Sequence, residues 1–220
     1  MPVRTNKNFA KKIFDILKKQ YPKVKPALEY SNPFELLIAT ILSAQCTDER
    51  VNIVTRQLFK KYRNPQDFIN ADDEELEKDI FSTGFYKQKA KSIKACCAEL
   101  IKNHKGKVPA DFDELVKLSG VGRKTASVVA GNAFGIPSIA VDTHVKRLSN
   151  LLGFVDSQNP DKIEMQLKEL LPESYWINAS HWLAMHGRKI CIANRPKCLE
   201  CVLADLCPSY NPNANQKKKK

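Results

Sequence analysis

Four cysteines near the C-terminus constrain this chain more than any other feature of its sequence. Cys191, Cys198, Cys201 and Cys207 lie within one short segment, separated by six, two and five residues. Random placement of four of the seven cysteines there is improbable, so we expect the segment to wrap around a metal centre. Zinc usually takes two Cys-x-x-Cys pairs, and only one such pair is present. The uneven spacing favours a 4Fe–4S cluster, with zinc as the alternative.

The other three cysteines indicate the compartment. Cys46, Cys96 and Cys97 occur in apolar patterns and are expected to be small core residues. An odd total argues against a pure disulfide framework and favours a reducing cytosol. No apolar stretch approaches the roughly 20 residues that span a bilayer. We therefore expect an intracellular protein.

The charge of the chain is strongly positive. The net charge is +12, and removing the four lysines of the terminal run Lys217–Lys220 still leaves +8. A basic body attracts polyanions, because each phosphate contact made by Lys or Arg releases counterions. A generically basic soluble protein is the alternative, so charge alone indicates nucleic acid only weakly. Residues 212–220 are expected to form a basic, disordered tail.

Helix-start signals recur along the chain and predict an all-α fold. The sequence Asn32-Pro33-Phe34-Glu35 places a capping asparagine, a first-turn proline and a returning glutamate before an apolar run. Asp72 with Glu75, and Asp111 with Glu114, repeat this pattern. Asn-Gly and Asp-Gly turns are missing, and no sustained period-two alternation is present. Apolar residues recur at helical spacing in three stretches: Phe9, Ile13, Ile16 and Leu17; Val51, Val54, Leu58 and Tyr62; Ala90, Ile93, Cys97, Leu100 and Ile101.

A glycine-rich turn lies in the segment Leu118–Thr125, LSGVGRKT. Its two glycines permit positive φ, and the helix start that follows suits a phosphate. The turn could equally be a plain connection between two packed helices. An earlier segment, 84–90 (GFYKQKA), resembles 120–126 (GVGRKTA), and each follows a capped helix. This similarity suggests two helix–turn–helix units, of which only the second has two glycines and a lysine in the turn.

Lys124 and Asp142 are candidate catalytic residues. Lys124 falls in the first turn of a helix, where the helix dipole and the charge of Arg123 both favour a neutral amine. Only a neutral amine attacks carbon and forms a Schiff base. A phosphate-contacting or solvent-facing lysine is the alternative. Asp142 is a natural N-cap for the next helix, and it could also accept protons from the amine and stabilise developing positive charge.

These features together resemble the endonuclease III family of DNA glycosylases, within the helix–hairpin–helix superfamily. The resemblance runs from about Asn32 to Cys207. It implies two helical domains with a DNA-binding cleft between them. Residues 26–136 would form a six-helix domain with the hairpin motif, and residues 1–25 with 137–211 the iron–sulfur cluster domain. The motifs that carry the resemblance are 42–48 (LSAQCTD), 120–124 (GVGRK), 141–144 (VDTH), 186–188 (HGR) and the four cysteines.

The resemblance also implies the activity. A member of this family would be a bifunctional DNA glycosylase/AP lyase of base excision repair, excising oxidised pyrimidines from duplex DNA. Lys124 and Asp142 match the catalytic pair: after base flipping the lysine attacks the sugar, and β-elimination cuts 3′ to the abasic site. The four C-terminal cysteines match the ligands of a 4Fe–4S cluster, which we expect to be structural. The implied partner is duplex DNA with damaged pyrimidines or abasic sites, bound by a monomer in a prokaryotic cytoplasm, at the nucleoid.

Several further residues match DNA contacts of the family. Gln45 and Phe85 would fill the gap left by the flipped base, although Phe is larger than the usual aliphatic wedge. Ser119 replaces a proline common before Gly-Val-Gly, which is expected to loosen the turn. The other expected contacts are Gly120, Val121, Gly122 and Arg123 of the hairpin, with Arg195 and Lys197 of the cysteine loop.

Three alternatives remain beside this reading. The adenine-mismatch glycosylase branch shares the cysteine spacing but typically lacks the hairpin lysine and carries a longer C-terminal domain. A non-catalytic DNA-binding module would use the hairpins and metal loop only to hold phosphates. A zinc-dependent hydrolase is disfavoured, because no His/Asp/Glu set completes an open metal site. His181 and His186 are expected to pack or to form hydrogen bonds.

Overall fold

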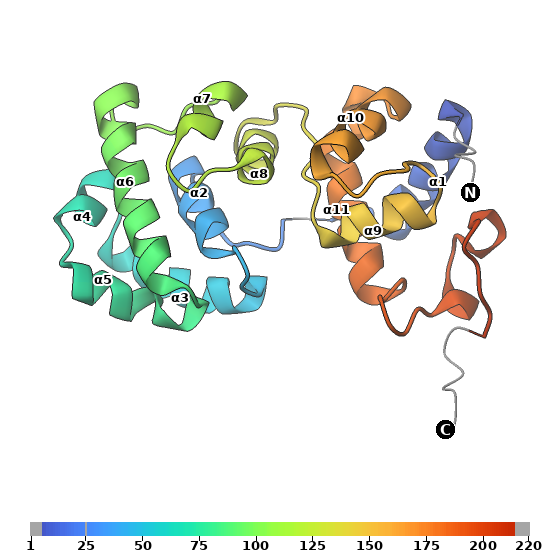
Figure 1. Cartoon of the computed structure of the whole chain (residues 1–220), viewed down its shortest axis with the longest axis horizontal. Helices are drawn as coiled ribbons and strands as arrows, with labels where there is room; N and C mark the ends of the chain where they lie inside the picture. The colour runs from blue at the N-terminus through green and yellow to red at the C-terminus, as the bar shows by residue number, and fades with distance from the viewer. Residues whose placement is uncertain (1–5, 25, 214–220) are drawn as a thin grey trace. The chain divides into compact units, whose positions relative to one another are not determined.

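The computed structural model describes residues 6–24 and 26–213, and every regular element among them is helical (Figure 1). The predicted all-α class is therefore confirmed. The chain divides into two compact units. Pro26–Ile136 forms one, called the middle unit, and the described residues on either side of it form the outer unit. None of the described helices is long and apolar enough to cross a membrane. The predicted tail lies outside the described residues from residue 214 onward.

The middle unit holds seven α-helices and one 3-10 helix. The resemblance implied a six-helix domain; the seven α-helices include two of only six residues, which Asn64 and Asp111 cap. The elements are α2 (Pro33–Leu42), α3 (Asp48–Lys61), α4 (Pro65–Asn70), α5 (Asp73–Ile80), η1 (Phe81–Thr83), α6 (Tyr86–His104), α7 (Phe112–Lys117) and α8 (Arg123–Phe134).

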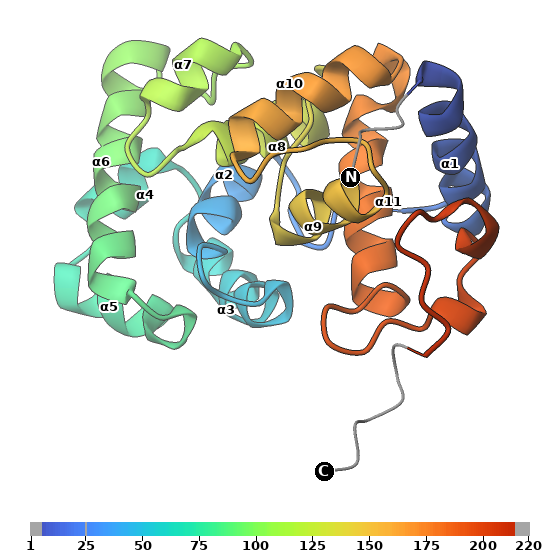
Figure 2. The same ribbon diagram turned by 45° about the vertical axis from the view of Figure 1, so that its right-hand side comes forward.

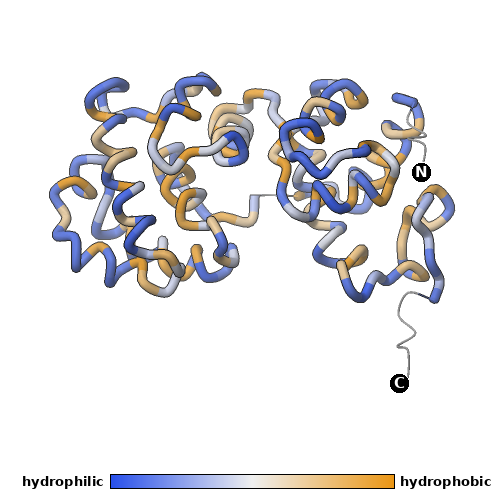
Figure 3. The backbone as a smooth tube through the Cα atoms, in the orientation of Figure 1, coloured by the Kyte–Doolittle hydropathy of each residue, from blue (hydrophilic) through white to orange (hydrophobic). Residues whose placement is uncertain are grey.

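Helix α2 is the centre of the middle unit. Eight of its ten residues are buried, and Figure 3 shows its hydrophobic run. A helix that is apolar all round needs neighbours on every side, and α2 contacts α3, α6 and α8. The predicted stripe of α3 is buried from Val51 to Tyr62, but Ile101 at the end of the α6 stripe is 37% exposed. Cys96 and Cys97 are fully buried, as predicted, whereas Cys46 is only half-buried.

The outer unit has its own hydrophobic core. Helix α1 buries Ala10, Ile13, Phe14 and Leu17, and it lies beside α11 in both ribbon views (Figure 2). The ring of Phe14 stacks on Phe154 with the centroids 5.4 Å apart. The elements are α1 (Lys7–Gln20), α9 (Thr143–Leu151), α10 (Pro160–Leu170), η2 (Glu173–Tyr175), α11 (Trp176–Lys189), η3 (Cys198–Glu200) and η4 (Ala204–Leu206).

The predicted helix caps are confirmed. The side chains of Asn32, Asp72 and Asp111 each accept a hydrogen bond from the backbone N–H three residues further on, at 2.9, 3.0 and 3.0 Å. The Glu35 carboxylate accepts from the N–H of Ser31, the residue before the cap, at 2.6 Å. The three cap bonds satisfy N–H groups that the helices leave without a partner, so the helix starts follow from local sequence.

Candidate nucleic-acid interface and metal centre

Two helices of the middle unit begin without a side-chain cap, and each follows a glycine turn. Helix α6 begins after Gly84-Phe85, and α8 begins after Gly120–Gly122. A side chain caps each of the other five α-helices of this unit. Because the first N–H groups of a helix have no partner inside it, an uncapped start offers donors to an anion. Helices α6 and α8 are the second helices of the two helix–turn–helix units that the sequence suggested.

The hairpin between α7 and α8 depends on its first glycine. Gly120 has φ +76°, and a Cβ atom there would lie 3.0 Å from the Cβ of Ser92 on α6. Gly122 instead has φ −87° and ψ 174°, with open space where a Cβ would be. Positive φ and close approach to α6 therefore explain Gly120 but not Gly122. A glycine at 122 keeps the approach to the start of α8 unobstructed.

Ser119 is tied to α6 by two hydrogen bonds. Its backbone N–H and its hydroxyl both donate to the Glu99 carboxylate of α6, each at 2.7 Å. A proline has no N–H to donate, so the serine makes a bond that the usual residue cannot. Glu99 lies 20 residues away in sequence, so no local pattern reveals this anchor.

Lys124 is exposed in the first turn of α8. Arg123, beside it, is also exposed, and its guanidinium carbon lies 5.0 Å from the centre of the Phe112 ring on α7. The side chain of Val121 is 5% exposed and belongs to the core of the middle unit. The hairpin thus offers solvent its backbone and the lysine, while the apolar residue at its tip holds it in place.

Gln45 and Phe85 share an unusual backbone conformation. Their φ angles are +54° and +48°, and both side chains are exposed, Phe85 to 66%. Left-handed backbone is uncommon for residues other than glycine and points to a local constraint. Gln45 follows α2, and Phe85 immediately precedes α6. The structure therefore presents both predicted wedge residues at the tips of tight loops of the middle unit.

Asp142 caps helix α9 in the outer unit. Its Oδ1 accepts a hydrogen bond from the Val145 N–H at 2.7 Å, which confirms the expected cap. A carboxylate has about four acceptor positions, so capping leaves capacity for another donor. His181 of α11 is close enough to feel the Asp142 charge, and burial lowers the pKa of His181 despite that charge.

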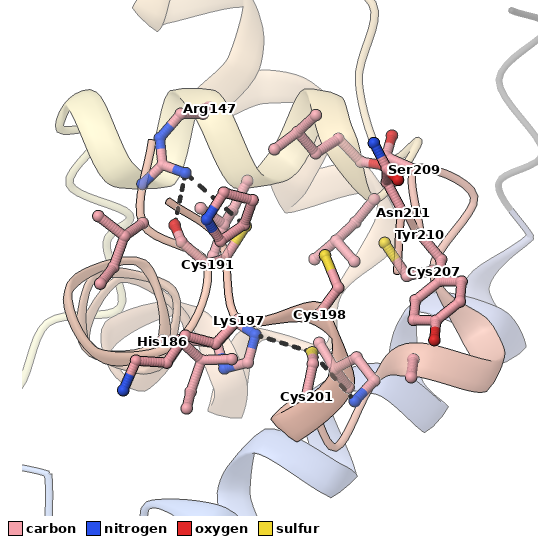
Figure 4. Close-up of a pocket in the computed structure, with 18 of the residues that line it drawn as sticks. Arg147, His186, Cys191, Lys197, Cys198, Cys201, Cys207, Ser209, Tyr210 and Asn211 are labelled. Carbon is pink, nitrogen blue, oxygen red and sulfur yellow. Dashed lines mark hydrogen bonds between the residues drawn. The ribbon is translucent and has the colours of Figure 1, made fainter. Parts of the chain in front are cut away.

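The four C-terminal cysteines line one cavity of the outer unit, of about 340 Å³ (Figure 4). All four are half-buried free thiols. Burial raises the pKa of Cys191, Cys201 and Cys207, and the charge of Cys198 raises each of them further. The four residues thus lie near one another, although 15 residues separate the first from the last.

Arg147 and His186 contact the cysteines from neighbouring helices. Arg147 Nη1 donates to the Cys191 carbonyl at 2.6 Å and lies 3.7 Å from the Cys191 Sγ. His186 Nε2 lies 3.5 Å from the Cys201 Sγ, and its Nδ1 lies 3.2 Å from the Tyr21 hydroxyl. These contacts support the expected hydrogen-bonding role of His186. Groups that hold thiolates in this way orient metal ligands and tune the centre that they bind.

The four thiols make this cavity a candidate metal centre. Soft thiolate ligands suit an iron–sulfur cluster, and they suit zinc as well.

The basic residues of the cysteine loop face solvent. Arg195 and Lys197 are both exposed. The Lys197 Nζ lies 3.7 Å from the Glu200 carboxylate, and its backbone N–H donates to the Ile190 carbonyl at 2.9 Å. The loop between the first two cysteines is therefore tied to the end of α11 while its cationic side chains stay accessible.

Comparison with known proteins gives consistent matches. The model of the HhH-GPD superfamily of base excision DNA repair proteins matches residues 38–173. The chain is 48% identical to endonuclease III of Synechocystis, covering 93% of this chain and 94% of the relative. It is 41% identical to endonuclease III of Escherichia coli K12, covering 92% and 96%. A solved structure of a trapped endonuclease III–DNA covalent intermediate matches with a TM-score of 0.90 and 47% identity, over 93% of this chain and 97% of that one.

The chain belongs to the endonuclease III family. As a member, it is a DNA N-glycosylase with AP lyase activity that acts in base excision repair. Relatives and chain have nearly the same length, so the similarity covers the whole enzyme and not one module. A purely DNA-binding module is thereby excluded.

Sequence reasoning missed the residues that support the site. Arg147 and Glu99 belong to no sequence motif, because each acts through a partner distant in sequence. Gly187 belongs to the 186–188 motif, and a Cβ there would lie 2.9 Å from the His144 Nδ1. The helical spacing of His144 and Arg147, three residues apart, was the one available signal that both share a face of α9.

Proposed function

We propose that Lys124 is the nucleophile of this enzyme and that its substrates are oxidised pyrimidines and abasic sites in duplex DNA. The observation that carries the proposal is an exposed lysine in the first turn of the uncapped helix behind the Gly120 turn. The covalent endonuclease III–DNA intermediate solved for a protein 47% identical to this chain supports it. A lysine amine forms such an intermediate with a sugar carbon.

The reaction follows from the chemistry of the amine. The Lys124 Nζ attacks C1′ of the flipped nucleotide through its lone pair, the C1′–N bond breaks, and the damaged base leaves with the bonding electrons and takes up a proton from water. Asp142 would accept the proton that the attacking amine loses and stabilise positive charge on the sugar. Ring opening gives a protonated Schiff base as O4′ takes that proton from Asp142, and loss of a C2′ proton to a base then eliminates the 3′ phosphate. The capping bond of Asp142 to Val145 would hold the carboxylate in one orientation.

The DNA-contacting groups divide into two kinds. Gln45 and Phe85 would enter the stack where the damaged nucleotide leaves it, because both are exposed at loop tips. The backbone of Gly120–Gly122 would bind phosphate, since α8 starts without a side-chain cap. The side chains of Arg123, Arg195 and Lys197 add positive charge along the backbone of the duplex. Such an enzyme would act on chromosomal DNA, at the nucleoid of a prokaryotic cell.

We propose further that Cys191, Cys198, Cys201 and Cys207 hold a 4Fe–4S cluster. The shared cavity and the contacts of Arg147 and His186 to two of the sulfurs support this assignment. The cluster is structural and fixes the loop that carries Arg195 and Lys197. Purified protein should absorb near about 400 nm and contain iron and sulfide. Stoichiometric zinc would contradict the cofactor and leave the glycosylase unaffected.

Borohydride trapping tests the nucleophile. The protein and DNA containing thymine glycol should give a covalent adduct, and Lys124→Gln should give none. Lys87→Gln is the matched control, because Lys87 is also an exposed lysine and the second residue of an uncapped helix, α6. It should keep full trapping at saturating DNA. An undiminished adduct with Lys124→Gln would refute the assignment.

A further inference from the structure

Lys89 of α6 is a buried lysine that the proposed chemistry does not use. Only 5% of it is exposed, and its ammonium donates to the carbonyls of Leu42 and Thr83, both at 2.8 Å. Burial lowers the pKa of Lys89, and the charge of Cys46 opposes that shift. Burying an ammonium is costly unless its hydrogen bonds are satisfied. Two backbone carbonyls take the place that an anion usually fills.

The two carbonyls lie at the ends of two separate helices, and a loop follows each. Leu42 is the last residue of α2, and Thr83 is the last residue of η1. Gln45 follows Leu42 by three residues, and Phe85 follows Thr83 by two. A single ammonium thus joins the bases of the two loops whose tips carry the proposed wedge residues.

The two loops also share an unusual backbone conformation, which is an observation independent of Lys89. Three non-glycine residues in the described part of the chain have positive φ: Gln45, Phe85 and Lys105. Lys105 ends α6, where left-handed residues are common. Gln45 and Phe85 lie in loops, where such a conformation is unfavourable and persists only if the surroundings impose it. The bonds from Lys89 supply a fixed base for both loops.

We propose that Lys89 is a positioning residue, which sets the Gln45 loop and the Phe85 loop relative to each other so that both side chains enter one gap in the duplex. The inference rests on the proposed DNA-contacting role of those two residues. An apolar residue at 89 could fill the space but would leave both carbonyls unpaired. A lysine that served stability alone would instead affect all activities of the enzyme equally.

The test compares a paired substrate with one that is already open. Single-turnover β-elimination is measured on an abasic site in a fully paired duplex and on the same site inside a bubble of mismatched bases. Lys89→Met should lower the first rate about tenfold and the second less than about twofold, since the bubble requires little opening of the stack. Lys89→Gln, which keeps an N–H donor, should fall between the wild type and Lys89→Met.

A spectroscopic measurement checks the cause. 2-Aminopurine opposite a tetrahydrofuran abasic analogue reports insertion into the stack, and saturating Lys89→Met should lose most of the fluorescence change given by the wild type. Lys94→Met is the matched control, because Lys94 on the same helix donates to the Ala71 carbonyl and pairs with Asp73, at the start of α5. It should behave like the wild type on both substrates.

The outcomes separate the inference from the function on which it rests. A wild-type protein that gives no borohydride adduct would refute the proposed function. A wild type that traps DNA, with Lys89→Met reducing both rates equally or neither, would overturn the positioning role alone. The ratio of the two rates does not depend on the fraction of folded protein, so partial unfolding of Lys89→Met cannot imitate the expected result.

Discussion

The turns at Gly84-Phe85 and at Gly120–Gly122 both begin at a glycine with positive φ, +71° in the first turn and +76° in the second. The residue after that glycine then separates them. Phe85 adopts φ +48° and is 66% exposed, whereas Val121 is 5% exposed. The first turn therefore projects an aromatic side chain, and the second projects its main chain. One local motif serves two tasks because its tip residue either leaves or joins the core.

The two turns are also held to α6 in different ways. Lys89 donates to the carbonyl at the base of the first turn, and Glu99 accepts from the N–H and hydroxyl of Ser119 in the second. A cation thus binds the end of a helix in one case, and an anion binds turn donors in the other, each matching the partial charge of its partner. Both arrangements orient the helix start that follows.

The largest expected effect concerns the lysine that only the second turn carries. Lys124→Gln should reduce strand cleavage by about 10³-fold or more, because the Schiff base cannot form. Adding Gln88→Lys to that variant should not restore cleavage, although residue 88 has the corresponding place after the first turn. Gel assays of nicked abasic DNA measure both. Rescue by Gln88→Lys would show that the two turns are interchangeable.

The two glycines of the second turn should respond differently to alanine. Gly120→Ala should destabilise the protein by about 2 kcal/mol, because it combines positive φ with a contact to Ser92. Gly122→Ala should change stability by less than about 0.5 kcal/mol, since its φ is ordinary and the space is open. Thermal unfolding followed by circular dichroism compares them. Equal losses would mean that the turn is not anchored through Gly120.

Alanine substitutions at the two tip residues, Phe85 and Val121, should affect activity and stability differently. Phe85→Ala should leave the melting temperature unchanged and lower excision from paired DNA about tenfold. Val121→Ala should lower stability by about 1–2 kcal/mol through loss of buried methyl groups, with little effect on the rate per folded molecule. Parallel melting curves and single-turnover rates test this pair. The same pattern in both variants would contradict the contrast between the turns.

The smallest expected effect lies at the anchor of the second turn. Glu99→Gln keeps the shape of the side chain but removes its charge and one acceptor oxygen. The bonds from Ser119 should weaken, and stability should fall by about 1 kcal/mol. Ser119→Ala should add little to Glu99→Gln if both act on the same contact, which a double-mutant cycle of thermal unfolding measures. If the two losses of stability add fully, the two residues do not act through the same contact.

Much of this protein could be predicted from residues a few positions apart. The caps at Asn32, Asp72 and Asp111 involve partners three residues away, so the sequence alone locates these helix starts. The all-α class follows from such signals, and the grouping of four cysteines follows from their spacing. Local hydrogen bonding and helical periodicity are encoded wherever they occur in the chain.

Other features arise only when distant segments meet. Lys89 looks like any helix lysine until α2 and η1 place two carbonyls around it, 47 and six residues away. From the sequence alone, Ser119 is only a residue that replaces a common proline; in the structure it bonds to Glu99. Arg147 likewise bonds to Cys191, which lies 44 residues later in the chain. Burial and partner distance decide whether a polar side chain costs or contributes free energy. The sequence by itself determined the helices and the chemical groups available, while tertiary packing decided which of those groups hold the others in place.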